Sequence, residues 1–169
     1  MRALLRYCLL AGLLLGLGLC GSLPGMAGTL VNKTAPQIAL RDLGGNALNL
    51  RSYRGKVVLL NFWATWCAPC QIEMPQFVEW QQRYAGRGLQ IVGISMDDDP
   101  ALVVSLRKKL KLNYPVAMGD EKLGALYGGI LGLPVTYLID RTGTVRAEYH
   151  GETDLKALES DLTRMLDQR

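Results

Sequence analysis

The sequence predicts an α/β domain in which a mixed β-sheet is flanked by helices on both faces. Two nearly continuous apolar runs, at residues 57–64 and 89–96, are typical of strands that are buried on both faces. Segments with helical periodicity separate and follow these runs, which favours parallel strands joined by crossover helices. Near the C-terminus, two further strand-like runs flank a tight turn at residues 141–143 and predict an antiparallel edge of the same sheet.

The composition fits a single folded domain and argues against one class of partner. Of the 169 residues, 49% are apolar and 20% are charged, which is ordinary for a globular protein. The net charge is only +4, and no basic block or basic–aromatic interleaving occurs. Nothing in this pattern argues for nucleic acid as a partner.

The N-terminal segment differs from the rest of the chain. Arg2 and Arg6 are its only charged residues, a leucine-rich run follows at residues 9–19, and small residues lie at the −3 and −1 positions of a cleavage point. This order is typical of an export signal, and the run is short for a membrane span of roughly 20 residues. Residues 1–27 are therefore predicted to be a signal peptide or, alternatively, an uncleaved N-terminal membrane anchor, and residues 28–169 to form the folded domain.

The cysteines divide between the leader and the domain. Of the four cysteines, Cys8 and Cys20 fall in the leader; lipidation at Cys20 is an alternative that Leu19 disfavours, because a small residue is expected there. Removal of the leader leaves Cys67 and Cys70 as one close pair. In an exported protein, such a pair lies in an oxidising compartment.

The first half of the domain alternates strands with a helix. Two short alternating runs around residues 44–45 predict a β-hairpin over residues 38–50, and the buried strand at 57–64 follows. A helix is predicted from Cys67, with a kink at Pro75, which has no N–H to donate. The side chains expected along one side of this helix are Phe77, Val78, Gln81 and Tyr84.

The second half begins with the strand at residues 89–96. Asp99 as N-cap and Pro100 in the first turn then open a helix, and a shorter helix is expected at 120–127. The apolar stripe of the first of these helices is predicted to consist of Leu102, Leu106 and Leu110.

The last three elements are two strands and a helix. Strands are expected at residues 135–140 and 144–150, paired antiparallel. Thr153 and Asp154 open the final helix. Its apolar face is predicted to consist of Leu155, Leu158, Leu162, Met165 and Leu166.

The Cys67-x-x-Cys70 pair has the spacing of a reactive dithiol. At the start of a helix, unpaired N–H groups and a partial positive charge stabilise a thiolate, so its pKa falls below the free value of about 8.5. The spacing of three lets the sulfurs meet within one turn. Cys67 is therefore expected to be the exposed attacking thiol and Cys70 the shielded thiol that resolves the mixed disulfide.

Two other uses of the pair, a metal site and a structural disulfide, fit the sequence less well. A structural zinc site needs four ligands, but the chain has no second Cys-x-x-Cys and a single histidine, His150, so a metal carrier would have to combine His150 with Cys67 and Cys70. A purely structural disulfide would close so small a ring that it would constrain little of the unfolded chain. No metal is therefore expected, and no cofactor other than a redox-active Cys67–Cys70 disulfide.

Residues 57–75, VVLLNFWATWCAPCQIEMP, resemble the active-site segment of thioredoxin-like proteins, in particular the exported TlpA/ResA/DsbE (CcmG) group. The resemblance covers most of residues 34–169, including the N-terminal lead-in and the segment YGGILGLPVTYLIDRTGTV at 127–145. It implies a thioredoxin fold with an N-terminal β-hairpin and with a central insertion over 100–127, where the group carries an added helix and strand.

The resemblance also implies roles for residues near the dithiol. Pro134 is expected to be cis and to lie beside the dithiol, which would leave the Leu133 backbone free to pair with a substrate strand. Glu73, three residues after Cys70, is expected to carry a proton to or from that thiol, and burial would raise its pKa. Trp66 is expected to cover Cys67 and contact substrates.

Two further positions near the dithiol are interpreted from the same resemblance. Trp63 is expected to be core beneath the dithiol. Asn61 stands where thioredoxins proper carry a buried aspartate, and an asparagine cannot take up a proton.

These features together predict a thiol–disulfide oxidoreductase that works outside the cytoplasm, in a bacterial periplasm. By resemblance it reduces disulfides in exported proteins, with apocytochrome c as the leading substrate, and is recharged by a membrane thiol electron donor of the DsbD/CcdA type. The cytochrome assignment is weakened at Val135, because DsbE-type members often carry an acidic residue after the cis-proline.

Three alternatives accompany this prediction. The first is a general periplasmic oxidant that introduces disulfides, and the second is a copper carrier that uses Cys67, Cys70 and His150. The third, a peroxidase, is disfavoured because Ala64 and Leu60 stand where the peroxidatic motif has Thr or Ser and Pro.

Overall fold

The computed structural model describes residues 29–168 of the chain. The predictions for residues 1–27, with Cys8 and Cys20, lie outside the described residues. Within the described part, no helix is long and apolar enough to cross a membrane.

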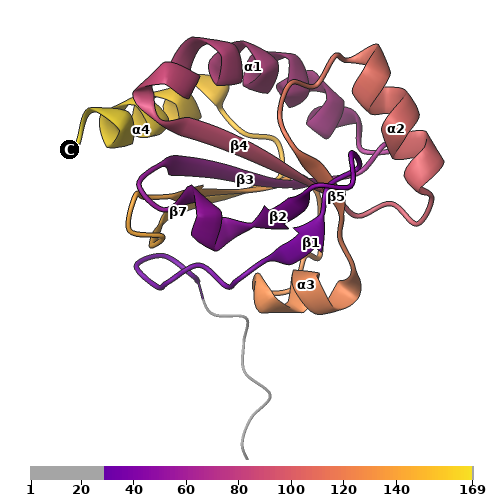
Figure 1. Cartoon of the computed structure of the whole chain (residues 1–169), viewed down its shortest axis with the longest axis horizontal. Helices are drawn as coiled ribbons and strands as arrows, with labels where there is room; N and C mark the ends of the chain where they lie inside the picture. Colours follow the sequence, from indigo (N-terminus) through magenta and orange to yellow (C-terminus); the bar gives the residue numbers. More distant parts are fainter. Residues whose placement is uncertain (1–28, 169) are drawn as a thin grey trace, which may run out of the picture.

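A five-stranded sheet forms the centre of the domain, in the order β5-β4-β3-β6-β7 (Figure 1). β3 and β4 pair in parallel, as do β4 and β5, whereas β6 pairs antiparallel with β3 and with β7. The predicted mixed sheet with a late antiparallel edge is therefore confirmed. Its strands are β3 (Val57–Trp63), β4 (Leu89–Ser95), β5 (Val116–Met118), β6 (Val135–Ile139) and β7 (Val145–His150).

The predicted N-terminal hairpin is confirmed as β1 (Ala39–Arg41) and β2 (Ala47–Asn49). Gly45 lies in its turn with φ of 83°, a conformation that a residue without Cβ adopts at little cost. The hairpin also reaches the central sheet, because the Leu43 N–H donates to the Val116 carbonyl of β5 at 2.8 Å. This contact covers part of an otherwise open sheet edge.

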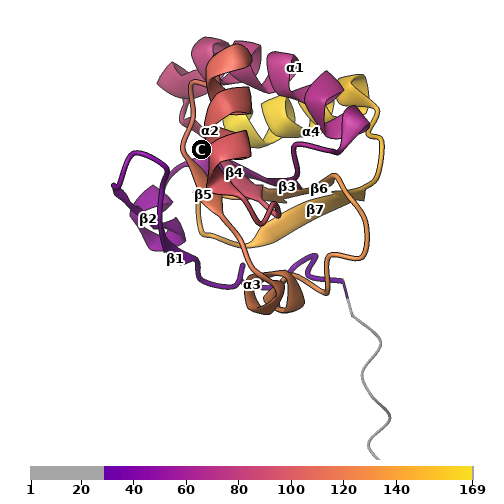
Figure 2. The ribbon, with the colours of Figure 1, turned by 90° about the vertical axis from the view of Figure 1, so that its right-hand side faces the viewer.

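Helices cover both faces of the sheet, as predicted. Figures 1 and 2 show α1, α2 and α4 on one face and α3, with the hairpin, on the other. The helices are α1 (Ala68–Tyr84), α2 (Pro100–Lys109), α3 (Glu121–Leu126) and α4 (Leu155–Asp167).

Strand β3 divides the hydrophobic core into two layers. Because successive side chains point to opposite faces, Leu59 and Trp63 pack with α1, α2 and α4, whereas Leu60 and Phe62 pack with the hairpin and α3. All four side chains are fully buried, and each such burial contributes roughly 1.5–3 kcal/mol. The continuous apolar run read from the sequence is thus explained by burial on both faces.

Helix α1 continues through Pro75, which does not end it. Its buried face includes Met74 and Trp80 in addition to the predicted Phe77, Gln81 and Tyr84, whereas Val78 is only partly buried. The full buried set follows the spacing of three and four that one side of a helix requires.

The predicted stripe of α2 is partly wrong. Leu102 is exposed, and the buried side chains are Val103 and Leu106, with Leu110 partly buried. Residues three or four positions apart lie on the same face of a helix, so the sequence is compatible with a stripe that begins at Leu102 or at Val103. Packing against the sheet selects the stripe that begins at Val103. The N-cap prediction is confirmed, because the Asp99 carboxylate accepts from the Ala101 N–H at 2.8 Å.

Candidate active site

The carboxyl end of β3 leads directly into the cysteine pair. β3 and β4 end side by side, with Trp63 opposite Ser95, and the Trp63 carbonyl accepts from the Met96 N–H at 2.8 Å. The chain then turns into α1, and the Cys67 N–H donates to the Ala64 carbonyl at 3.2 Å. The cysteines are thereby placed at the strand ends, where α/β folds commonly carry their sites.

Cys67 is the N-cap of α1, and Cys70 lies in its first turn. The two form a disulfide with Cα atoms 5.3 Å apart, and the Cys70 N–H donates to the Cys67 sulfur at 3.3 Å. The first turn contains no acidic residue, and Pro69 lies within it. A thiolate released at Cys67 would therefore face unpaired helix N–H groups and the positive end of the helix dipole.

The prediction that Cys67 is an exposed thiol is wrong for this disulfide form. Only 5% of Cys67 and 1% of Cys70 are exposed to solvent. Both cysteines belong to the apolar cluster beneath α1, and Leu133 packs against that cluster. Burial of both sulfurs is the physical reason for the correction, although Cys67 remains the more accessible of the two.

A carboxylate that the sequence reasoning missed holds the turn before Cys67. Asp97 accepts three hydrogen bonds, from the Thr65 N–H at 2.8 Å, the Thr65 hydroxyl at 2.6 Å and the Ser95 hydroxyl at 2.7 Å. The Gln71 side chain of α1 donates to the Thr65 carbonyl at 2.7 Å. The signal that was available is the position of Asp97, just after a buried strand that runs parallel to the strand leading into the dithiol.

Glu73 is buried on α1, with only 3% of the residue exposed. One carboxylate oxygen, Oε1, accepts from the Thr153 N–H at 3.3 Å, and the other, Oε2, has no hydrogen-bond partner among the described residues. Burial raises the pKa of Glu73 to about 7, and the hydrogen bonds from Thr153 oppose this effect. The predicted burial of Glu73 is confirmed, and this burial is the physical cause of the raised pKa.

A groove of about 490 Å³ opens beside Glu73. Its walls are Pro69 and Ile72 of α1, residues 152–154 of the loop between β7 and α4, and the first two residues of α4, Leu155 and Lys156. The Glu73 carboxyl group lines this groove, three residues along the helix from Cys70.

The two tryptophans differ in environment. Trp63 is fully buried, as predicted, whereas 72% of Trp66 is exposed. A large apolar side chain this exposed beside the disulfide offers a contact surface to another molecule.

Leu133 and Pro134 lie immediately before β6, and their peptide bond is cis, as predicted. The Pro134 carbonyl accepts from the Gly151 N–H at 2.8 Å. Among residues 29–168, neither the N–H nor the carbonyl of Leu133 has a hydrogen-bond partner. Leu133 thus presents free backbone groups and packs against the cluster that contains Cys67 and Cys70.

Two other residues of interest have structural partners. Asn61 is buried and donates to the Thr136 hydroxyl at 3.0 Å, so its amide is used within the core. His150 lies at the end of β7, with Nε2 3.7 Å from Oε1 of Glu148. In the part of the chain that the structure describes, no three His, Cys, Asp or Glu residues form a group that fits a metal ion.

Comparison with known proteins finds close similarity over most of the chain. The AhpC/TSA family profile matches residues 31–148. The thiol-disulfide oxidoreductase ResA of Bacillus thuringiensis (subspecies konkukian) is 36% identical over 137 residues, which are 80% of this chain and 78% of the relative. The thioredoxin-like protein YneN of Bacillus subtilis is 33% identical over 131 residues, 76% of each chain.

Solved structures show the same arrangement of strands and helices. A crystal structure from Chlorobium tepidum, named as a thiol:disulfide interchange protein DsbE, superposes with a TM-score of 0.76 and 30% identity. The superposition covers 82% of this chain and 99% of that one. The predicted thioredoxin fold is therefore confirmed.

Proposed function

The chain belongs to the AhpC/TSA family of thioredoxin-like proteins and is a thiol–disulfide oxidoreductase, and from this premise we propose that it works as a reductant of protein disulfides. The observation that carries the proposal is the cysteine pair at the tip of α1, with Cys67 as N-cap and Cys70 one turn into the helix. The geometry supports different roles for the two sulfurs.

The proposed reaction consumes two thiols and one substrate disulfide. The Cys67 thiolate attacks one sulfur of the substrate disulfide, a mixed disulfide forms, and the other substrate sulfur leaves as a thiolate that takes up a proton. Cys70 then loses its proton and attacks Cys67, which releases the second substrate thiol and leaves the Cys67–Cys70 disulfide. Two electrons pass from the protein to the substrate.

Glu73 is proposed to be the proton carrier for Cys70. It lies three residues after Cys70 on one helix, and its pKa of about 7 lets it both accept and donate a proton near neutral pH. Its Oε2, which has no hydrogen-bond partner among the described residues, is the available acceptor, and Glu73 lines the groove between α1 and residues 152–156.

Substrate binding is proposed to use Trp66, Leu133 and Pro134. The exposed Trp66 ring offers apolar contact area, and the free backbone groups of Leu133 allow an extended substrate segment to add strand-like hydrogen bonds. These contacts would hold the substrate disulfide over Cys67 without reading much of its sequence.

The proposed substrates are exported proteins, with apocytochrome c as the first candidate. This choice rests on the resemblance of residues 34–169 to the exported TlpA/ResA/DsbE group, and relatives named ResA and DsbE are among the similar proteins. A membrane thiol donor of the DsbD/CcdA type would return two electrons to the Cys67–Cys70 disulfide. Residues 1–27, acting as signal peptide or anchor, would place the domain in the periplasm, either free or tethered to the inner membrane.

Substrate capture in the native compartment tests the proposed roles. In Cys70→Ala, Cys67 has no resolving partner, so we expect substrates to accumulate as mixed disulfides that a thiol reagent releases. Cys67→Ala is the matched control and should capture none. Capture by Cys67→Ala instead of Cys70→Ala would reverse the assignment.

The reduction potential tests the proposed direction. If the protein is a reductant, the reduction potential of its Cys67–Cys70 disulfide should be close to that of thioredoxin, roughly −270 mV. A general oxidant has a reduction potential near roughly −120 mV. Equilibration of the full chain with glutathione buffers, followed by alkylation of Cys67, measures this value. A reduction potential near the value for an oxidant would contradict the proposal and favour the alternative, a protein that introduces disulfides.

A further inference from the structure

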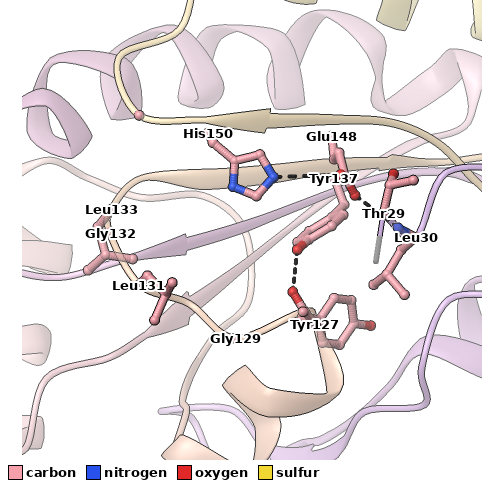
Figure 3. A pocket seen from close by; sticks show the side chains of 12 residues that line it. Thr29, Leu30, Tyr127, Gly129, Leu131, Gly132, Leu133, Tyr137, Glu148 and His150 are labelled. Carbon is pink, nitrogen blue, oxygen red and sulfur yellow. Dashed lines mark hydrogen bonds and ion pairs between the residues drawn. The ribbon is translucent and has the colours of Figure 1, made fainter. Parts of the chain in front are cut away.

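A pocket of about 500 Å³ lies beside the Leu133 segment, between the loop before β6 and the end of β7 (Figure 3). Leu133 and Gly151 both line the pocket. The Gly151 N–H donates a hydrogen bond to the carbonyl of Pro134, the residue after Leu133. The pocket is therefore continuous with the segment on which we place the substrate polypeptide.

The pocket has two tyrosine walls whose hydroxyl groups are already hydrogen-bonded. The Tyr137 hydroxyl donates to the Tyr127 carbonyl at 2.6 Å, and the Tyr127 hydroxyl donates to the Pro36 carbonyl at 2.6 Å. The exposed Leu131 side chain stands across from Tyr137 in Figure 3. Burial and the nearby Glu148 carboxylate raise the pKa of Tyr137 to about 12, so its ring remains neutral.

Among the described residues, one carboxylate that lines this pocket has no lysine or arginine partner. Glu148 is 19% exposed at its side chain; it accepts from the Leu30 N–H at 3.1 Å and lies 3.7 Å from His150, an imidazole that is charged only when protonated. Within residues 29–168, no Lys or Arg pairs with Glu148. Asp140, by comparison, is paired with Arg146 at 2.7 Å.

We propose that this pocket binds a lysine or arginine side chain of the substrate, close in sequence to the reacting cysteine. This inference rests on the proposed function. Lysine and arginine have long apolar stems, which suit the tyrosine and leucine walls, and a charged head, which suits Glu148. An aspartate or glutamate in the same position would face Glu148 with a like charge.

The register of the sheet sets the reach that is required. Val135 of β6 pairs with His150 of β7, and Tyr137 pairs with Glu148. Glu148 is therefore two residues, roughly 6.6 Å, farther than His150 from the end of the sheet at which Leu133 lies. A substrate segment bound at Leu133 has side chains on one side every second residue. We therefore place the basic residue within three positions of the cysteine, and the peptide series below scans these positions.

Reduction of synthetic peptides tests the pocket. Each twelve-residue peptide contains one internal disulfide and either Arg, Gln or Glu at one of the three positions on either side of the cysteine pair. We expect one position at which the reduced full chain acts on the Arg peptide about fivefold faster than on the Gln peptide, and on the Glu peptide more slowly. The preference should shrink as salt is added.

Variants of the chain assign this preference to one carboxylate. Glu148→Gln retains an acceptor for the Leu30 N–H but not the charge, and should remove the Arg preference. Glu121→Gln, at an exposed position of α3 outside the pocket, should keep it. Glu148→Lys should reverse the order in favour of the Glu peptide. An Arg preference that survives in Glu148→Gln, or its absence at all positions in the wild type, overturns the inference.

The same peptides distinguish a failure of the pocket proposal from a failure of the proposed reductant role. Thiol–disulfide exchange runs both ways, so the oxidised chain is also mixed with the dithiol forms of the peptides. If only this direction proceeds, the proposed reductant role fails, and the Arg preference is read from the oxidation rates instead. Equal rates for all three peptides in both directions refute the pocket's role alone.

Discussion

Two buried carboxylates near the disulfide, Asp97 and Glu73, are used in opposite ways. Both oxygens of Asp97 are occupied by donors from Thr65 and Ser95, whereas Oε2 of Glu73 has no partner among the described residues. Both side chains are buried, so the two carboxylates differ mainly in how many hydrogen bonds they accept. A fully bonded carboxylate fixes backbone geometry, and an underbonded one is free to exchange a proton.

The largest expected effect concerns the pH dependence of stability. The pKa of Glu73 rises from an ordinary 4.5 to about 7 on folding, so the folded state holds this proton to higher pH than the unfolded state does. The contribution of Glu73 to the free energy of unfolding should therefore be fully present below pH 4.5 and fall by about 3 kcal/mol between pH 4.5 and 7. Urea unfolding of the oxidised chain at several pH values measures this slope.

Glu73→Gln provides the reference for that slope. Glutamine does not titrate, so the difference between wild type and variant isolates Glu73 from every other titrating group. Curves that run parallel over this pH range would show that the Glu73 carboxyl group is solvated.

The next effect is on the rate of exchange. Without a proton acceptor for Cys70, Glu73→Gln should resolve mixed disulfides about a hundredfold more slowly at pH 7. Stopped-flow mixing of the reduced chain with a disulfide peptide measures the rate. Glu79→Gln on the exposed side of the same helix is the control and should remain within twofold of the wild type. A similar rate for both variants would leave the proton transfer to water.

The smallest of the three effects is on the stability supplied by Asp97. Asp97→Ala removes the acceptor from the Thr65 N–H and from two hydroxyl groups, and should lower the free energy of unfolding by about 2 kcal/mol. Asp98→Ala, at the exposed neighbouring position, should cost less than about 0.5 kcal/mol. Equal losses, measured by urea unfolding, would mean that Asp97 does not hold the turn before the dithiol.

Most of the elements were predictable because their signals are local. The apolar runs of β3 and β4, the Asp99 N-cap and the turn between β6 and β7 each depend on neighbouring residues. β5, with only three residues, was too short to be recognised from its own pattern. The stripe of α2 was predicted incorrectly because two stripes fit its helical spacing.

The features of the candidate active site can be separated in the same way, into those set by local sequence and those set by tertiary packing. The sequence by itself determined that a Cys-x-x-Cys pair begins a helix after a buried strand, and that a carboxylate follows three residues later, because these relations lie within one turn of chain. Only the tertiary structure decided that Cys67 is buried in the disulfide form, that Asp97 braces Thr65 from 32 positions away, and that Glu148 shares a pocket with Leu133. Those outcomes depend on how strands and helices distant in sequence pack together, and residue order along the chain does not contain those distances.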